Sequence, residues 1–243
     1  MKVELLDAGS FTAPAGIWRR GDAMDRQVRF PVPAFLIETA EERILVDTGL
    51  HPEAVADPGR RYGASEALEL FRLELEAGID EQIDLDTITK VVLTHLHFDH
   101  AGGLGLLPPS VPIVVQRREW LAGHEAAAVA KNFYMPVDYA TDGRPVTLVD
   151  GDHDLLGDGS IQLLLTPGHT PGHQSVRVGE RLVIGADVTH FASGLDDHRF
   201  PIFGDDFAAQ ASSADRLRAL RDAGAMVLPG HDPAVLKPGA IVV

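Results

Sequence analysis

The chain has 243 residues, of which 45% are hydrophobic and 23% are charged, so it can bury a sizeable core as a single domain spanning residues 1–243. Its formal net charge of −15 argues against binding to nucleic acid and against docking on an anionic membrane, because both need a basic surface. It contains no cysteine, which excludes disulfides and thiolate-rich metal sites.

Short apolar runs alternate with helical patterns along the chain, which indicates an α/β fold. The predicted strands, in chain order, are Val3–Leu6, Ala34–Glu38, Arg43–Val46, Lys90–Leu93, Pro112–Val115, Ile161–Leu165, Gln174–Val178, Arg181–Ile184 and Met226–Leu228. The predicted helices are Ser65–Ala77, with Ser65 as N-cap, Arg117–Ala122 and Phe207–Asp222.

Two segments, Phe11–Arg29 and Phe191–Asp206, fit neither pattern because they mix aromatic residues, proline or glycine, and charges. Loops of this length in a compact domain are often lids over a functional site, and the alternative is an ordinary surface connection. The sequence leaves both interpretations open.

No targeting or membrane-spanning segment is visible in the sequence. Met1–Ser10 lacks a basic region followed by an apolar stretch. No run of about 18 apolar residues occurs elsewhere. We therefore expect a cytoplasmic protein.

Four of the predicted strands lead directly into histidine or aspartate residues. Ligands of open α/β sheets collect beyond the strand ends, so we expect these side chains to converge at one edge of the molecule. In chain order they are the segment His95–His100, His169, Asp187 and His231.

The pattern His-x-His-x-Asp-His in His95–His100 fits metal binding. His95 and His97 are two residues apart, so in an extended segment both side chains face the same way. Asp99 and His100 follow as the chain turns and can reach a neighbouring position. Imidazole and carboxylate groups suit zinc and other first-row divalent ions.

These motifs resemble those of the metallo-β-lactamase superfamily, and the resemblance covers nearly the whole chain. It implies a four-layer αβ/βα sandwich of two pseudo-equivalent halves, with the metals at one edge between the sheets. Asp47, in Leu45–Gly49, matches the first motif of the superfamily. We expect Asp47 to support the ligands through hydrogen bonds and not to bind metal.

Within the superfamily the chain is most similar to the N-acyl homoserine lactonases, which are quorum-quenching enzymes. Three stretches carry this similarity: Thr94–Gly103, Ile113–Arg117 and Thr166–Ser175. The first and third are partly generic to the superfamily. The second contains no metal ligand, so it is more specific to the lactonase subgroup.

The resemblance assigns seven ligands to two divalent metal ions, with zinc as the default and manganese, iron or cobalt as alternatives. One ion would be held by His95, His97 and His169, the other by Asp99, His100 and His231, and Asp187 would bridge both. His173 is either a supporting group outside the ligand set or an ordinary histidine at the start of a strand.

The resemblance also implies the reaction. A hydroxide held between the two metals would attack the lactone carbonyl, and Asp99 could pass a proton to the departing alkoxide. These lactonases commonly place a tyrosine three residues after the bridging aspartate, but here that position is His190. His190 could donate a hydrogen bond to the developing oxyanion, alter the substrate preference, or serve only in packing.

An apolar pocket for the acyl tail is expected beside the metals. We predict that Phe98, Trp18, Met24 and Tyr62 bind substrate, with Phe30 and Phe203 as further candidates; each could instead belong to the core. The partner would be a small-molecule lactone or ester, and a homodimer is compatible with the sequence.

Two rival interpretations remain. A glyoxalase-II-like thioesterase, or another carboxylic-ester hydrolase, would use the same metals, although such thioesterases carry a basic C-terminal region that is not evident after His231. A metal-binding module without activity is the non-enzyme alternative. A structural site would be closed by four ligands, whereas seven ligands shared by two ions leave positions open for water.

Overall fold

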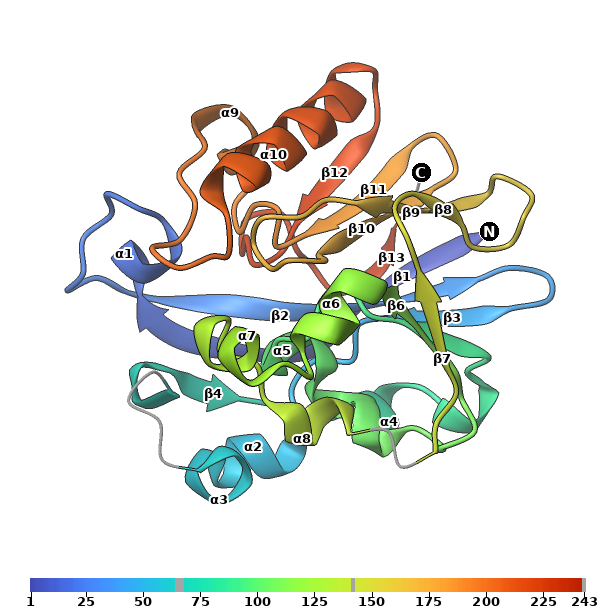
Figure 1. Cartoon of the computed structure of the whole chain (residues 1–243), viewed down its shortest axis with the longest axis horizontal. Helices are drawn as coiled ribbons and strands as arrows, with labels where there is room; N and C mark the ends of the chain where they lie inside the picture. The colour runs from blue at the N-terminus through green and yellow to red at the C-terminus, as the bar shows by residue number, and fades with distance from the viewer. Residues whose placement is uncertain (64–67, 141–142, 242–243) are drawn as a thin grey trace.

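Two mixed β-sheets pack face to face, and helices cover their outer faces (Figure 1). The computed structural model describes residues 1–63, 68–140 and 143–241. Within these residues the larger sheet has the order β13 (Gly239–Ile241), β1 (Lys2–Pro14), β2 (Gln27–Glu38), β3 (Arg43–Val46), β5 (Lys90–Val92), β6 (Ile113–Gln116) and β7 (Val146–Val149), and β4 (Arg72–Glu74) pairs with β1. The smaller sheet has the order β12 (Met226–Pro229), β11 (Leu182–Ala186), β10 (Gln174–Val178), β9 (Ile161–Leu165) and β8 (His153–Asp154).

Helices lie outside both sheets. In Figure 1, α10 lies above the smaller sheet, whereas α2, α3, α4 and α8 lie below the larger one. The described helices are α1 (Ala15–Trp18), α2 (Pro52–Ala56), α3 (Pro58–Tyr62), α4 (Ile79–Gln82), α5 (Phe98–Ala101), α6 (Arg117–Ala122), α7 (Ala126–Lys131), α8 (Pro136–Tyr139), α9 (Gly194–Asp197) and α10 (Phe207–Asp222), with 3-10 turns η1 (Leu68–Leu70), η2 (Leu85–Thr87) and η3 (Gly102–Leu106).

Successive side chains of a strand point to opposite faces of its sheet, and this alternation produces the four layers. Ile44 of β3 and Ile184 of β11 point into the core between the sheets, whereas their neighbours Leu45 and Val183 point outward. Val183 packs in one cluster with Leu217 of α10. Successive side chains of a strand face opposite sides, so each strand fills two cores. The predicted four-layer αβ/βα sandwich is confirmed.

The strand directions bring the candidate ligands to one edge. β3 and β5 are parallel, and so are β11 and β12. β9 and β11 are both antiparallel to β10, so they run in the same direction. The segments that follow these strands carry Asp47, His95, His169, Asp187 and His231.

Most predicted elements are observed. The bounds of Arg43–Val46, Ile161–Leu165, Gln174–Val178, Arg117–Ala122 and Phe207–Asp222 agree with the structure to the residue. Several short elements were not predicted, including β4, β7, β8, β13 and most of the one-turn helices. No helix among the described residues is long and apolar enough to cross a membrane.

The predicted helix Ser65–Ala77 is wrong where the structure describes it. Ser65 lies outside the described residues, Leu68–Leu70 forms a 3-10 turn, and Arg72–Glu74 forms strand β4. β1 is longer than predicted, and β4 pairs with its added length, with Leu73 opposite Phe11. This strand pairing outweighs the helical spacing of apolar residues in the segment.

Candidate metal centre

All seven predicted metal ligands lie together in the structure, and all are buried. Their ligand atoms form two adjoining groups, in each of which the atoms lie within 4.8 Å of one another. The first group is His95, His97, His169 and Asp187, and the second is Asp99, His100 and His231.

The first group has the dimensions of a four-ligand metal site. His97 Nδ1 lies 3.0 Å from His95 Nε2 and 3.0 Å from His169 Nε2. Asp187 Oδ2 lies 3.3 Å from His169 Nε2 and 3.8 Å from His95 Nε2. Ligands about 2.0–2.1 Å from a tetrahedral zinc ion lie about 3.3 Å from each other, so these separations fit one cation.

The second group is slightly wider. Asp99 Oδ2 lies 3.5 Å from His231 Nε2 and 3.9 Å from His100 Nε2. Asp187 reaches this group as well, because its Oδ1 lies 3.2 Å from His231 Nε2 and its Oδ2 lies 3.6 Å from His100 Nε2. Asp187 is therefore placed where a ligand shared by two cations would be.

Hydrogen bonds on the far side of the rings set which nitrogen faces the centre. His97 Nε2 donates to the Asn132 carbonyl at 2.8 Å, and His231 Nδ1 donates to the Pro31 carbonyl at 2.8 Å. A carbonyl oxygen can only accept, so each ring carries its proton there. The opposite nitrogen of each ring therefore faces the centre and is the one that can bind a metal.

Asp47 supports the ligands as the sequence predicted. It is buried, and its backbone adopts a φ of 58°, a conformation uncommon outside glycine. Its Oδ1 accepts from the Thr94 amide at 2.7 Å, and its Oδ2 accepts from Thr94 Oγ1 at 2.7 Å and from His100 Nδ1 at 2.8 Å. Asp47 therefore fixes both the His100 ring and the start of the His95 loop.

Two buried ligand atoms have no hydrogen-bond partner among the described residues, namely His100 Nε2 and Asp187 Oδ1. A buried polar atom without a partner costs free energy. A bound cation would satisfy both atoms, and the donor set of imidazole nitrogens and carboxylate oxygens suits first-row divalent ions. The residues present therefore fit two metal ions.

The electrostatics of the two groups differ. Burial, reinforced by the neighbouring imidazoles of His100 and His97, holds the pKa of His95 well below its usual value. Burial also lowers the pKa of His100, yet the carboxylates of Asp187, Asp99 and Asp47 outweigh it and raise that pKa well above its usual value. His95 in the first group is thus held neutral, whereas a cation at the second group competes with a proton for His100.

His173 is a supporting group, the first of its two predicted interpretations. It is buried, and its Nε2 accepts a hydrogen bond from the Asp187 amide at 3.1 Å. Burial lowers the pKa of His173 to about 3, so the ring stays neutral and keeps this acceptor. Gly230 crowds Asp187 from the other side, because a Cβ there would lie 1.9 Å from Asp187 Oδ1.

His190 lies inside the centre. Its Nε2 is 3.2 Å from Asp187 Oδ2, and its ring stacks on that of His231 with centroids 5.3 Å apart. Neither ring nitrogen has a partner with hydrogen-bond geometry among the described residues. Burial lowers the pKa of His190 to about 4, so the ring is neutral and can donate from one nitrogen.

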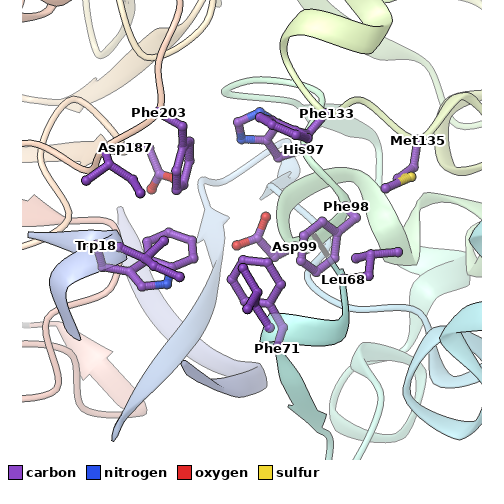
Figure 2. Close-up of a pocket in the computed structure, with 13 residues that line it drawn as sticks. Trp18, Leu68, Phe71, His97, Phe98, Asp99, Phe133, Met135, Asp187 and Phe203 are labelled. Carbon is purple, nitrogen blue, oxygen red and sulfur yellow. The ribbon is translucent and has the colours of Figure 1, made fainter. Parts of the chain in front are cut away.

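A pocket of about 250 Å³ opens onto the ligands. Figure 2 shows Trp18 and Phe203 on one side of it and Leu68, Phe98 and Met135 on the other, with the Asp99 carboxylate between them. The full lining comprises Ile17, Trp18, Leu68, Leu70, Phe71, His97, Phe98, Asp99, Phe133, Met135, Asp187, Ile202 and Phe203.

Only some of the predicted substrate-binding residues line this pocket. Trp18, Phe98 and Phe203 do. Met24 does not, because its side chain lies against Gly16 at the surface. Tyr62 lies behind Phe98, with ring centroids 6.1 Å apart, and Phe30 is fully buried in the core beside Trp18.

The sequence did not identify most of the pocket wall. Leu68, Phe71, Phe133, Met135 and Ile202 come from separate connecting segments. Apolar residues in such segments follow no period that would set them apart from core residues. The weak signal available was the pair of unassigned segments: Phe11–Arg29 contributes Ile17 and Trp18, and Phe191–Asp206 contributes Ile202 and Phe203.

The chain is similar to members of one protein superfamily over most of its length. The family model of the metallo-beta-lactamase superfamily matches residues 28–231. The N-acyl homoserine lactonase AiiA of Bacillus thuringiensis subsp. kurstaki is 31% identical, over 84% of this chain and 82% of that protein. The N-acyl homoserine lactonase AttM of Azorhizobium caulinodans is 28% identical, over 96% of this chain and 94% of that protein.

A solved structure supports the same relationship. It is an N-acyl homoserine lactone hydrolase with the product N-hexanoyl-L-homoserine bound at its catalytic metal center. The TM-score is 0.83 at 27% sequence identity, and the match covers 96% of this chain and 94% of that one.

We expect cation binding at pH 7 to release protons, and cation affinity to fall as the pH falls. The carboxylates around His100 and His231 raise the pKa of both rings against the effect of burial, so a proton competes with the metal for these rings. Calorimetric titration of chelator-treated protein with Zn²⁺, in buffers of different ionisation enthalpy, counts the protons released. His198→Gln, a change outside the centre, serves as control. An affinity independent of pH would contradict the assignment.

Proposed function

This chain belongs to the metallo-beta-lactamase superfamily, and we propose that it is a dinuclear metal-dependent hydrolase that opens the lactone ring of N-acyl homoserine lactones. One observation carries the proposal: two adjoining groups of buried imidazoles and carboxylates face a pocket with apolar walls. Similarity to curated lactonases over most of both chains supports the choice of substrate.

We propose that the first cation is bound by His95, His97 and His169, the second by Asp99, His100 and His231, and that Asp187 binds both. Zinc is our choice of metal, with manganese, iron and cobalt as alternatives for such ligands. When bound, the two cations polarise the ester carbonyl and make water a nucleophile near neutral pH.

The chain's own residues position the substrate and move the proton. Asp99 lines the pocket, so its carboxylate is placed to accept a proton from the attacking water and to pass it to the alkoxide oxygen when the ring C–O bond breaks. His190 donates a hydrogen bond to the oxygen on which negative charge develops. Its neutral ring, packed between Trp18 and His231, is held in place for this role.

The pocket wall suits an acyl chain. Trp18 and Phe203 bring apolar surface close to the ligands, with ring centroids 5.5 Å from His231 and 6.1 Å from His169, and Leu70 and Ile202 continue the wall to the exposed rim. Burial of methylene groups against such a wall stabilises the bound substrate. No lysine or arginine lines the pocket in the part of the chain that the structure describes, which disfavours an anionic thioester of glutathione.

Wild-type protein is expected to bind two divalent cations and to release ring-opened N-acyl homoserine from the lactone. Asp187→Ala is expected to lose both the second equivalent of metal and turnover, because it removes the shared ligand. Metal analysis and product detection by mass spectrometry check this. Turnover of a glutathione thioester without turnover of the lactone would favour the thioesterase instead.

His190→Phe is expected to lower kcat for the lactone by about 10²–10³-fold, because it removes one donor to the developing oxyanion. Both cations should remain bound, and His190→Tyr should recover most of the activity because a phenol also donates. Steady-state kinetics with metal analysis check this. Loss of a cation in His190→Phe would identify His190 as a ligand and refute the donor role.

Ile202→Ala is expected to lower kcat/KM for long-chain lactones by about fivefold, corresponding to about 1 kcal/mol of lost apolar contact at the half-exposed rim. Short-chain lactones should be unaffected because they do not reach this residue. The control is Leu121→Ala, which removes an exposed leucine outside the pocket. Equal effects on all chain lengths would show that the rim does not bind the tail.

A further inference from the structure

The lactonase-like segment Ile113–Arg117 supplies no metal ligand. Two residues after it lies Glu119, whose burial is unusual for an acidic side chain. Glu119, in the first turn of α6, is fully buried. No lysine or arginine forms an ion pair with it among the described residues. A buried carboxylate is costly unless it is well hydrogen-bonded, so its partners matter.

Four donors surround the Glu119 carboxylate. Oε1 accepts from the Leu96 amide at 3.0 Å and from Tyr134 Oη at 2.7 Å. Oε2 accepts from Thr170 Oγ1 at 2.8 Å and from the Gly172 amide at 2.9 Å. Each oxygen therefore binds one backbone N–H, which cannot turn away, and one hydroxyl, which can.

Three of these donors belong to the segments that carry the three histidines of the first cation site, and Tyr134 lies on a segment that hydrogen-bonds one of them. Leu96 lies between His95 and His97, and Thr170 follows His169 directly. Tyr134 lies two residues after Asn132, whose carbonyl accepts from His97. The His169 segment also packs directly on α6, because a Cβ on Gly172 would lie 2.2 Å from the Glu119 nitrogen.

We infer that Glu119 is a positioning residue that fixes the spacing between the His95–His97 loop and His169, and so determines how tightly the three-histidine site holds its cation. The inference rests on the proposed metal centre. None of the hydrogen bonds of Glu119 reaches His100 or His231, so the effect should be confined to one of the two sites.

Glu119→Gln tests this with little change in size. The amide group must direct its NH₂ either at the Leu96 amide or at the Gly172 amide, and neither backbone N–H can accept a hydrogen bond. One of the two loops therefore loses its acceptor, whichever way the side chain turns. Truncation is avoided, so no cavity forms in the core.

The measurement is a titration of chelator-treated protein with Co²⁺, followed by visible absorption and by competition with a chelator. Wild-type protein should take up two equivalents. Glu119→Gln should retain one equivalent at wild-type affinity and bind the other at least tenfold more weakly, with a changed absorption spectrum. Thr170→Val removes one donor on the His169 side and should weaken the same site to a smaller extent.

The matched control is Arg144→Gln. Arg144 is a buried cation that donates to four backbone carbonyls, those of Leu104, Leu107, Pro108 and Val111. Its loss should lower the Tm while both cations stay tightly bound. Equal weakening of both sites in Glu119→Gln, or unchanged affinity with only a lower Tm, would overturn the inference.

The titration tests the positioning role of Glu119 separately from the proposed lactonase activity. Two wild-type equivalents with site-selective loss in Glu119→Gln would support the positioning role even if no lactone were hydrolysed. If Glu119→Gln does not fold, Thr170→Val decides: a selective loss supports the role, and wild-type binding at both sites refutes it.

Discussion

The structure depends on one constraint: five imidazoles and two carboxylates converge in a buried space. Such a cluster is unfavourable by itself, because burial removes water from its polar atoms. Several neighbouring side chains stabilise the cluster through hydrogen bonds. Asp47, His173 and Glu119 take no ligand position, yet each hydrogen-bonds a ligand residue or a residue beside one. A pair of bound cations would make the arrangement favourable.

The two segments that the sequence left open, Phe11–Arg29 and Phe191–Asp206, turn out to form one wall together. The Ile202 amide donates to the Ile17 carbonyl at 2.9 Å, and Arg19 and Arg199 form ion pairs across the two segments with Asp197 and Asp22. These pairs remain partly accessible to solvent, so each contributes little stability. Their effect is to hold the two segments together, so that Trp18 and Phe203 both line the pocket.

The sequence predicted well which histidines and aspartates lie together, and it predicted the pocket poorly, for physical reasons. Metal ligands follow strand ends at short, fixed spacings, so His95, His169 and Asp187 stand out in the sequence itself. Pocket residues such as Leu68 and Met135 are apolar side chains on connections, and nothing in the sequence separates them from the core. The sequence does not reveal the role of Glu119 either, because an acidic residue in the first turn of a helix is ordinarily exposed and stabilises the helix there. Burial distinguishes it, and burial is a property of the fold.

The most direct test of this account is anomalous diffraction from crystals grown with zinc, measured at the zinc edge. The account predicts two peaks about 3.5–4 Å apart, one among His95, His97 and His169, the other beside Asp99, His100 and His231, with Asp187 contacting both. A single peak, or two peaks that do not share Asp187, would contradict it.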